Sequence, residues 1–564
     1  MHTFWKSGVL PGLCRNGLAI VLIMATVILT VYFYFQKYQL GLVRYFDVDE
    51  FAYLNFAHQF LTGSKPYQDF IYLSPPGYLL FLIPIVRYVS PESVLTVMRQ
   101  AVFGSFVFLS AGAAFLFWQM RKSWWWVAVP LILVFLPLPS DKFLESRPDT
   151  LMMALFTLGV AFQIRAFQSA FAKSGGHVTS RGSDVYSASA DFSVRSQKPS
   201  ALQKSERDES LFPFFLSGFF YSAATFVLQK TFLLIPWSII VILFWLIRGQ
   251  KYGGWKQNIS VLAVFGFGLS SFLWVLLFWS YSQGTLGNLW YYLVVFVKES
   301  NVLASLYPFP LYLLYLPNGA YYGLDGYHTG FLLNAILWIG AVPLSVLAIF
   351  VSFIKYRKKA RFYTDLLLNG FLIFTLFIYW RFPSMKHPQY LIPASVFVVL
   401  VWTDTIDSIW NSIKKNLIGV VGFSCVYAIV LLYLFRGYQD VNTVKFYWHN
   451  RFDKEMLIFL TEHIPKSDYV LDLVGLAYLY PQPYFFCCIP FGQFQPYLSR
   501  LYPSLLDAID RTDTKYIYQG TSWRMMALSG KDQQYINSRF TQVGCGALLV
   551  RNDMLSAFQN VDVP

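Results

Sequence analysis

Carboxylates that could act as a catalytic base gather just past the first hydrophobic segment. The stretch YFDVDEFAY (45–53) contains Asp47, Asp49 and Glu50. The segment 18–35 before it is apolar and long enough to span a bilayer, which takes about 20 residues. The acids are therefore expected at the mouth of a membrane helix. A carboxylate held there could deprotonate an acceptor hydroxyl during transfer from a lipid-anchored donor.

Other polar residues fall at the same predicted depth, although they come from separate loops. They are Lys65, Asp69, Glu145, Arg147, Asp149, Lys230, Lys386, His387 and Tyr390. Each has an ordinary structural explanation: Lys230 could snorkel to the interface, and Arg147 could simply pair with Asp149 at a helix start. Because all of these residues are predicted on the same face of the membrane, a shared functional site is favoured over separate structural roles. Lys and Arg can hold a lipid phosphate while a carboxylate takes a proton, so direct displacement needs no covalent intermediate.

The composition predicts a polytopic membrane protein. Of the 564 residues, 56% are hydrophobic and 13% are charged, and the mean hydropathy is +0.46. Soluble domains are about 25% charged. The net charge is +14, but the basic residues lie in short loops between apolar runs, which is the positive-inside pattern. Anionic membrane lipid, and no nucleic acid, is therefore the expected partner of these charges.

About eleven membrane spans are predicted, and one short apolar run is ambiguous. The spans lie near residues 18–36, 99–118, 124–139, 149–167, 212–228, 231–247, 258–280, 330–354, 364–380, 390–403 and 417–435. If the run 78–89 does not cross and the N-terminus is cytoplasmic, the basic clusters, such as Lys355–Arg361, all face the cytoplasm. If it crosses, the later clusters lie outside. The positive-inside rule thus favours a re-entrant or interfacial helix at 78–89.

Two domains follow from this topology. Residues 1–435 are expected to form the transmembrane catalytic domain, and residues 436–564 a small extracytoplasmic α/β domain. The first domain would contain an outer catalytic loop at 37–98 and an aromatic outer loop at 281–328. The Ser-, Gly- and Lys-rich segment 168–209 is expected to be a disordered cytoplasmic linker.

The tail has its own local signals. An amphipathic helix is predicted at 455–464, and strands at 468–475, 514–520 and 546–552. Cys545 could form a disulfide with Cys487 or Cys488, and free thiols are the alternative.

At these residues the chain resembles the GT-C superfamily of integral-membrane glycosyltransferases. More narrowly, it is similar to the group of protein O-mannosyltransferases and lipid A aminoarabinose transferases. The first outer loop of that group contains an Asp-Glu pair, a Gly-x-x-Pro-Tyr-x-Asp stretch and a Pro-Pro helix, which stand here in DEFAYLNFAHQFLTGSKPYQDFIYLSPPGYLLFLIP (49–84). Further matching elements are VMRQAVF with Arg99, SRPDTLMMALF (146–156), ATFVLQKTFLL (224–234) and KHPQYLIPA (386–394). The likeness covers about residues 20–435.

The resemblance implies both a fold and a reaction. The fold would be a polytopic α-helical membrane protein with about eleven transmembrane helices and a small C-terminal α/β domain. The reaction would be inverting transfer of a sugar from a polyprenyl-phosphate donor to a glycan, lipid or protein on the extracytoplasmic face. A bacterial inner membrane is the expected location, with the endoplasmic reticulum as the alternative.

The resemblance also implies roles for individual residues. Asp49 would be the general base, with Asp47 as a rival, and Glu50 would be its partner or a contact to a metal or acceptor. Phosphate would be held by Lys230, Lys386 and Arg99, and the donor site would be lined by His387 and Tyr390. Whether a divalent metal takes part is left open.

The chain departs from the group at one place, and two other functions compete. Many relatives have Lys or Glu-Lys directly before the Pro pair, where this chain has Leu73-Ser74; Lys65 is the candidate to compensate. A transporter would place ionisable groups near the bilayer midplane, and the predicted spans contain almost none. A polymerase or ligase using a diphosphate-linked glycan would favour a large basic outer loop, but loop 281–328 has only Lys298 and His328 as basic residues.

Overall fold

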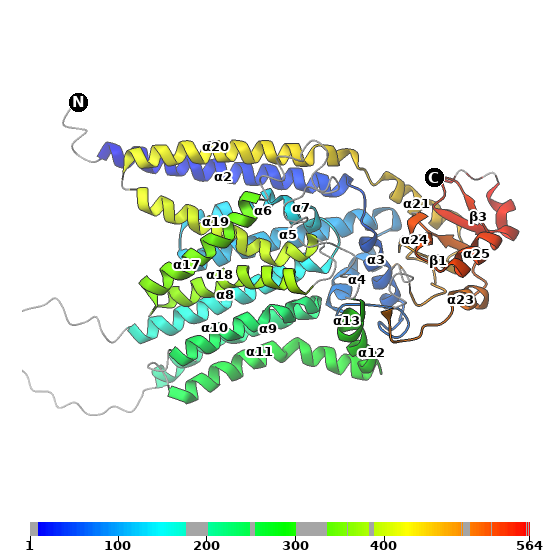
Figure 1. Ribbon diagram of the computed structural model, residues 1–564, viewed down its shortest axis with the longest axis horizontal. Helices are drawn as coiled ribbons and strands as arrows, with labels where there is room; N and C mark the ends of the chain where they lie inside the picture. The colour runs from blue at the N-terminus through cyan, green and yellow to red at the C-terminus, as the bar shows by residue number, and fades with distance from the viewer. Residues whose placement is uncertain are drawn as a thin grey trace, which may run out of the picture.

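A computed structural model of the chain shows a helical bundle joined at one end to a small domain with a sheet (Figure 1). The structure describes residues 9–175, 201–248, 254–300, 335–357, 359–382, 388–414, 416–486, 488, 497–520, 522–559, 561 and 563–564. The end of the bundle next to the small domain is called the domain end below.

The bundle consists of apolar helices, most of which are long. They are α2 (Val9–Val43), α5 (Pro91–Arg121), α6 (Ala128–Phe135), α8 (Pro148–Gly175), α9 (Ala201–Val227), α10 (Ile235–Arg248), α11 (Gly254–Ser282), α17 (Gly340–Tyr356), α18 (Ala360–Arg381), α19 (Ile392–Ile413) and α20 (Leu417–Asn442). Within the described residues, nine helical segments are long and apolar enough to cross a membrane. The shorter apolar helices Trp124–Phe135 and Leu211–Val227 account for the other two predicted spans. The predicted fold class is thereby confirmed.

Several predicted boundaries are wrong because helices extend beyond their apolar cores. The predicted linker 168–209 is helical at both ends: α8 continues to Gly175 and α9 begins at Ala201. Likewise α2 continues to Val43, into the loop predicted to start at residue 37, and α20 continues to Asn442, past the predicted domain boundary. Hydropathy detects the part of a helix that contacts lipid, whereas backbone hydrogen bonding continues into the polar end turns.

Small residues let two helices of the bundle approach closely. A Cβ atom on Gly218 of α9 would lie 2.2 Å from the carbonyl oxygen of Phe265 in α11. A Cβ on Gly268 of α11 would lie 2.3 Å from the carbonyl oxygen of Phe215 in α9. Membrane helices associate through such close backbone packing, because lipid offers no hydrophobic drive. Substitution at either glycine would force these helices apart.

Two short helices lie at the domain end, between the bundle and the small domain (Figure 1). They are α3 (Val48–Leu61) and α4 (Gly77–Tyr88), and they pack against each other. At 12 residues, α4 is about 18 Å long, too short for a hydrocarbon core of about 30 Å. This length agrees with the prediction that the run 78–89 does not cross the membrane. The loop 281–328 contributes α12 (Leu286–Trp290) and α13 (Phe296–Ser300) to the same end; its residues 301–328 lie outside the described part.

The small domain is a mixed four-stranded sheet with flanking helices. Its order is β1 (Val470–Asp472), β2 (Tyr516–Tyr518), β4 (Leu548–Arg551) and β3 (Phe540–Val543); β1 and β2 are parallel and the other pairs antiparallel. The helices are α21 (Arg451–His463), α23 (Leu505–Arg511), α24 (Ser522–Met526) and α25 (Gly530–Arg539). The strands β1, β2 and β4 are the predicted ones. The strand β3 (FTQV) was missed because it is short and its two middle residues are polar and exposed, so it has no apolar run or alternation.

The cysteines resolve one open alternative. Cys545 is a free, exposed thiol, and Cys488 is disulfide-bonded. A disulfide of Cys545 with either Cys487 or Cys488 is therefore wrong. Cys545 lies in the turn between β3 and β4, where its thiol donates a hydrogen bond to the carbonyl of Pro564 at 2.7 Å.

The small domain docks directly on α3. Gly475 has a φ of +112°, and a Cβ there would lie 2.6 Å from the carbonyl carbon of Phe51. Asp472 at the end of β1 fixes this turn by accepting hydrogen bonds from the amides of Val474, Gly475 and Ala477 at 2.6–2.8 Å. Only glycine fits such a close approach at positive φ. The domain is thus seated one helical turn from the acids at the start of α3.

Candidate active site

The acids of YFDVDEFAY lie at the N-terminus of α3, and two of them begin that helix. Asp47 is the N-cap, and its Oδ1 accepts the amide of Asp49 at 3.0 Å. Glu50 Oε1 accepts the amide of Asp47 in return at 2.9 Å. This reciprocal arrangement is a capping box, which the D-x-x-E spacing specifies locally. The same spacing that suggests chemistry thus also has a folding role.

Glu50 is fully buried and belongs to a closed ion pair. Both of its carboxylate oxygens bind the guanidinium of Arg99, at 2.6 and 3.1 Å, and Oε2 also accepts the amide of Ser146 at 2.9 Å. Arg99 uses its remaining N–H groups on the carbonyls of Gly41, Arg44 and Tyr45 at 2.6–2.7 Å. A guanidinium has five N–H donors, and all of them are engaged here.

Two predicted roles are corrected by this geometry. Arg99 has no donor left for a phosphate, and it is 3% exposed. Glu50 has no exposed oxygen for a metal or an acceptor. Both residues instead hold the ends of α2 and α3 together. Sequence pattern could not show this, because a buried pair and an exposed pair use the same residue types.

Arg147 connects the acids of α3 to the loop before α8. Its Nη2 donates to Asp47 Oδ1 at 2.8 Å, its Nη1 lies 2.5 Å from Asp49 Oδ2, and its Nε donates to Glu145 Oε2 at 2.7 Å. The side chain is 7% exposed. Three carboxylates from two parts of the chain therefore converge on one guanidinium. This agrees with the prediction that these acids and Arg147 lie at the same depth.

Two further cations complete this group. Lys142 donates to both oxygens of Glu145 at 2.7 Å and to Asp47 Oδ2 at 3.2 Å, and Arg44 Nη1 lies 3.3 Å from Glu145 Oε1. Sequence reasoning missed both, although Lys142 stands in the quoted motif DKFLESRPD. Three cations and three carboxylates form what is called the acid–base cluster below: Arg44, Asp47, Asp49, Lys142, Glu145 and Arg147.

The three acids of α3 differ sharply in exposure. The side chain of Asp49 is 48% exposed, that of Asp47 is 20% exposed and that of Glu50 is buried. Burial raises the pKa of Asp47, but the charges of Arg147 and Lys142 outweigh it and hold that pKa well below its usual range. A carboxylate with a very low pKa is a poor proton acceptor. Asp49 is the acid of α3 that a substrate can reach.

A second ion pair lies at the entry to the neighbouring helices. Lys230, in the 3₁₀ turn Gln229–Leu233, donates to Asp149 Oδ1 at 3.0 Å, and its ammonium lies 4.0 Å from the ring centre of Tyr390. Asp149 is in the first turn of α8, where the helix dipole favours an acid. Lys230 is 35% exposed, so it can also meet a substrate anion. Lys386 and His387 lie outside the described residues.

Tyr53 links the two ion-paired groups. Burial raises its pKa far above the usual value, and the charges of Asp49 and Asp149 raise it further, while Arg147 lowers it. Its ring contacts that of Tyr78 edge to face at 5.1 Å. Tyr78 in turn shares a hydrogen bond with Ser146 at 2.8 Å. Neutral phenol groups therefore fill the space between the acids.

Lys65 and Asp69 form a separate turn. The amide of Lys65 donates to Asp69 Oδ2 at 2.7 Å, and its ammonium donates to the carbonyl of Gln283 at 3.4 Å, at the end of α11. Among the described residues, no ion pair or hydrogen bond joins either side chain to the acid–base cluster. The KPYQD sequence closes a turn and ties it to α11, and a substrate-binding role of Lys65 and Asp69 stays a prediction.

The small domain contributes a cation that sequence reasoning missed. Arg524 of α24 is 4% exposed and donates to the carbonyl of Cys488 at 3.2 Å. Its guanidinium also interacts electrostatically with Asp49, Asp47 and Asp472; burial lowers its pKa more than these charges raise it. No local pattern relates this residue to the acids of α3, because Asp47 and Asp49 lie more than four hundred positions away in the chain.

The carboxylates are arranged for ion pairing with Arg and Lys. Within the part of the chain that the structure describes, no group of three His, Cys, Asp or Glu side chains could hold a metal ion. The oxygens of Asp47, Glu50 and Glu145 are engaged by guanidinium, ammonium or amide groups. We therefore derive no step through a metal.

Comparison with known proteins identifies the architecture. No protein-family model and no curated protein matches the sequence. Among solved structures, ArnT from Cupriavidus metallidurans in the apo state aligns with a TM-score of 0.56 at 11% identity, over 96% of this chain and 99% of that one. The same protein bound to undecaprenyl phosphate gives 0.53 at 11% identity, over 97% and 99%.

A third solved structure extends the likeness. The archaeal oligosaccharyltransferase AglB from Archaeoglobus fulgidus, in complex with an inhibitory peptide and a dolichol-phosphate, aligns with a TM-score of 0.51 at 12% identity, over 94% of this chain and 74% of that one. The chain therefore shares the fold of ArnT and AglB.

Proposed function

We propose that this protein transfers a sugar from a polyprenyl-phosphate donor to a hydroxyl of a glycan, lipid or protein. One observation carries the proposal: at the domain end of a GT-C fold, Asp49 is half exposed although Arg147 pairs with it, whereas Asp47 and Glu50 beside it are much less exposed among their cations. An exposed carboxylate set in a rigid ion-paired frame is what a general base requires.

The reaction follows from this placement. Asp49 takes the proton of the acceptor hydroxyl, and that oxygen attacks the anomeric carbon as the bond from this carbon to the phosphate oxygen breaks. The electron pair leaves with the polyprenyl phosphate, and the configuration inverts. Lys230, 35% exposed beside Tyr390, stabilises the charge that develops on the leaving phosphate.

We place the site on the extracytoplasmic face of a bacterial inner membrane. The helix α5 begins near the acid–base cluster and ends at Arg121, and the terminal turns of α10, α17 and α18 at that opposite end contain Arg248, Lys355 and Arg361. The positive-inside rule assigns a basic end to the cytoplasm. The domain end then faces outward, where a flipped lipid-linked sugar is available.

Sugar transfer from a panel of radiolabelled polyprenyl-phosphate monosaccharides into membrane fractions tests the proposal. Wild type, Asp49→Asn and Asp47→Asn are compared at equal amounts of folded protein. We expect transfer to be lost in Asp49→Asn and to persist at a reduced level in Asp47→Asn, because Asp47 only supports the frame. Equal loss in both variants would contradict the assignment of the base. No transfer from any donor by folded wild type would exclude a monosaccharide donor.

The likeness to AglB supports a second candidate, transfer of a whole glycan from a diphosphate-linked lipid. The two candidates differ in the leaving group, so adding diphosphate-linked oligosaccharides to the same panel separates them.

A further inference from the structure

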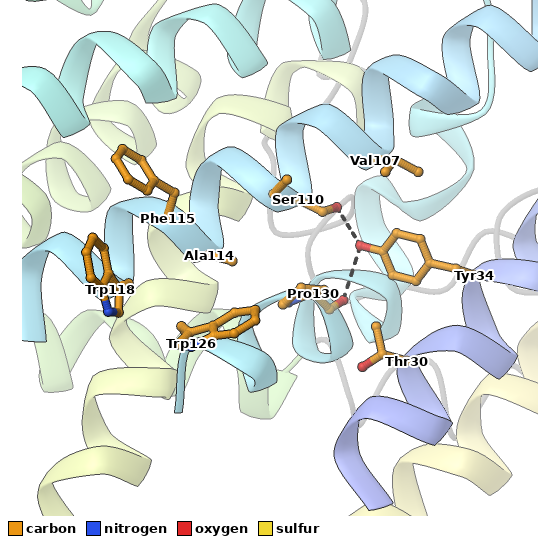
Figure 2. Close-up of a pocket in the computed structure, with 10 residues that line it drawn as sticks. Thr30, Tyr34, Val107, Ser110, Ala114, Phe115, Trp118, Trp126 and Pro130 are labelled. Atoms are coloured by element: carbon orange, nitrogen blue, oxygen red, sulfur yellow. Dashed lines mark hydrogen bonds between the residues drawn. The ribbon is translucent and has the colours of Figure 1, made fainter. Parts of the chain in front are cut away.

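A cavity of about 520 Å³ opens between α2, α5 and the segment Trp124–Phe135 (Figure 2). Its wall is apolar, with Val107, Ala111 and Phe115 on α5. The polar groups inside it are bonded to each other: the hydroxyl of Tyr34 donates to Ser110 Oγ at 2.5 Å. A volume of this size is typical of pockets that hold small-molecule ligands, about 300–1,000 Å³. The cavity therefore offers space for an apolar chain.

The tryptophan end of the cavity lies far along α5 from Arg99, the ion-pair partner of Glu50 in α3. Arg99 and Trp118 both belong to α5, and at 1.5 Å per residue they are about 28 Å apart along the helix axis. This is close to the thickness of the hydrocarbon core, about 30 Å. Trp118 and Trp126, which line one end of the cavity, are 41% and 43% exposed, as interfacial tryptophans are. That end of the cavity thus reaches the membrane surface opposite the proposed active site.

Positive charge stands at this same end. The ammonium of Lys122 lies 3.6 Å from the ring centre of Trp118, and it donates to the neutral Oε1 of Gln119 at 2.9 Å. Lys122 and Arg165 are both exposed. Partial desolvation of the Lys122 ammonium and the nearby charge of Arg165 lower the pKa of Lys122. Neither cation is paired with a carboxylate among the described residues. An anion between them would relieve their repulsion.

The neighbouring Arg121 shows the contrast. Its guanidinium binds Asp365 at 2.8 Å and Asp404 Oδ2 at 2.8 Å, so its charge is neutralised within the protein. Arg121 is thus paired with two carboxylates, whereas the adjacent Lys122 has no carboxylate partner among the described residues. The cation without an acid is the one that stacks on the tryptophan of the cavity.

We propose that this cavity binds an anionic phospholipid of the leaflet opposite the active site, with one acyl chain between α2 and α5 and its phosphate between Lys122 and Arg165. The apolar wall and the two cations match the two parts of such a lipid. A reacting sugar donor with its phosphate at this position is excluded from this role, since Trp118 lies about 28 Å along α5 from Arg99, the ion-pair partner of Glu50 in α3. The proposal is independent of the proposed function.

Lipid retention tests it. The full-length protein is reconstituted in bilayers of equimolar phosphatidylcholine and phosphatidylglycerol, extracted in mild detergent, and its co-purifying lipids are measured by mass spectrometry. Two variants probe the site: Lys122→Asn with Arg165→Gln removes the charge, and Ala111→Trp fills the cavity. Asn is chosen because Lys122 has a φ of +53°, which Asn tolerates. Lys256→Gln, which removes an exposed charge at the same end of the bundle, is the control.

We expect wild type and the control to retain phosphatidylglycerol several-fold over phosphatidylcholine. Both site variants are expected to retain the two lipids in the ratio of the bilayer. Wild type that retains both lipids equally, or site variants that keep the enrichment, would overturn the proposal. Ala111 is exposed, so the tryptophan does not enter buried packing, and size-exclusion profiles verify that each variant is folded.

Discussion

Asp49 and Arg147 form an ion pair in which the carboxylate is open to solvent and the guanidinium is not. Asp49 Oδ2 lies 2.5 Å from Arg147 Nη1, with the two side chains 48% and 7% exposed. A buried cation thus orients an exposed acid. This asymmetry distinguishes Asp49 from Glu50, whose partner Arg99 is as deeply buried as the acid itself.

Arg147→Lys is predicted to reduce transfer strongly while most of the protein still folds. Lysine keeps the charge but cannot donate in three fixed directions to Asp47, Asp49 and Glu145. A base displaced by about 1 Å can cost about 100-fold in rate. Initial rates at saturating donor measure the effect. Arg361→Lys, at a half-exposed pair with Asp365, is the control, and comparable losses in the two variants would contradict a specific role.

Glu50→Gln is predicted to destabilise the protein. The substitution leaves the guanidinium of Arg99 without its counter-charge in a buried site, and breaking a buried pair costs about 3–5 kcal/mol. The midpoint of thermal unfolding in detergent measures the loss. Arg451→Gln removes one partner of an exposed pair with Glu455 and should leave the midpoint unchanged. An unchanged midpoint for Glu50→Gln would show that the pair contributes nothing.

Lys230→Gln is predicted to lower kcat/KM for the lipid-linked donor about 10- to 150-fold, because a charge-assisted hydrogen bond to phosphate contributes about 1.5–3 kcal/mol. Steady-state kinetics with varied donor measure it. Lys65→Gln removes a lysine from the turn tied to α11 and should leave the donor dependence as in wild type. If Lys65→Gln had the larger effect, the phosphate site would lie elsewhere.

The fold could be predicted from the sequence because its signals are local. Long apolar runs specify membrane helices, and the clustering of acids with Arg147 follows from their shared depth once the topology is fixed. Exposure could not be predicted in the same way. Asp49 and Glu50 are adjacent in α3 and point about 100° apart, so one faces solvent and the other faces Arg99.

Contacts between residues far apart in the chain could not be predicted from the sequence either. Arg44 and Lys142 join the cluster through tertiary contacts, and Arg524 comes from a different domain. The sequence offered Lys65 to compensate for the lysine missing before the Pro pair, and it could not show that the ammonium of Lys65 binds a carbonyl of α11. The sequence pattern thus identified residue types at the right depth in the membrane, whereas tertiary packing determines which of these residues contact each other.

Asp453 is predicted to make stability pH-dependent. Burial raises its pKa to about 6, while the amide of Phe46 and the charge of Arg99 lower it and Glu50 raises it. Between about pH 4 and pH 6 the folded state binds more protons than the unfolded state, so stability falls as pH rises through this window. Asp453→Asn removes the free-energy cost of ionising this buried carboxyl group. Its unfolding midpoint should exceed that of wild type at pH 8, with a difference that shrinks toward pH 4; a constant difference would contradict the cause.

Arg524→Gln is predicted to move the acidic limb of the pH–activity profile to higher pH. The charge of Arg524 interacts with Asp49 and Asp47, and a positive charge near a carboxylate stabilises its ionised form, so its removal disfavours the form of the base that accepts a proton. Arg524→Lys keeps the charge and should restore the limb toward wild type. Profiles of kcat/KM for all three proteins, measured over the same buffers, give the comparison.

The control for Arg524 is another arginine of the small domain. Arg500 donates to Asn288 Oδ1 at 3.1 Å beside α12 and is exposed, so Arg500→Gln removes a charge from the domain contact without approaching the acids. If both glutamine variants lose activity with an unmoved acidic limb, the small domain acts only by packing on α3. If Arg524→Gln alone moves the limb, the domain supplies part of the electrostatic field in which the base works, and the two parts of the chain form one active site.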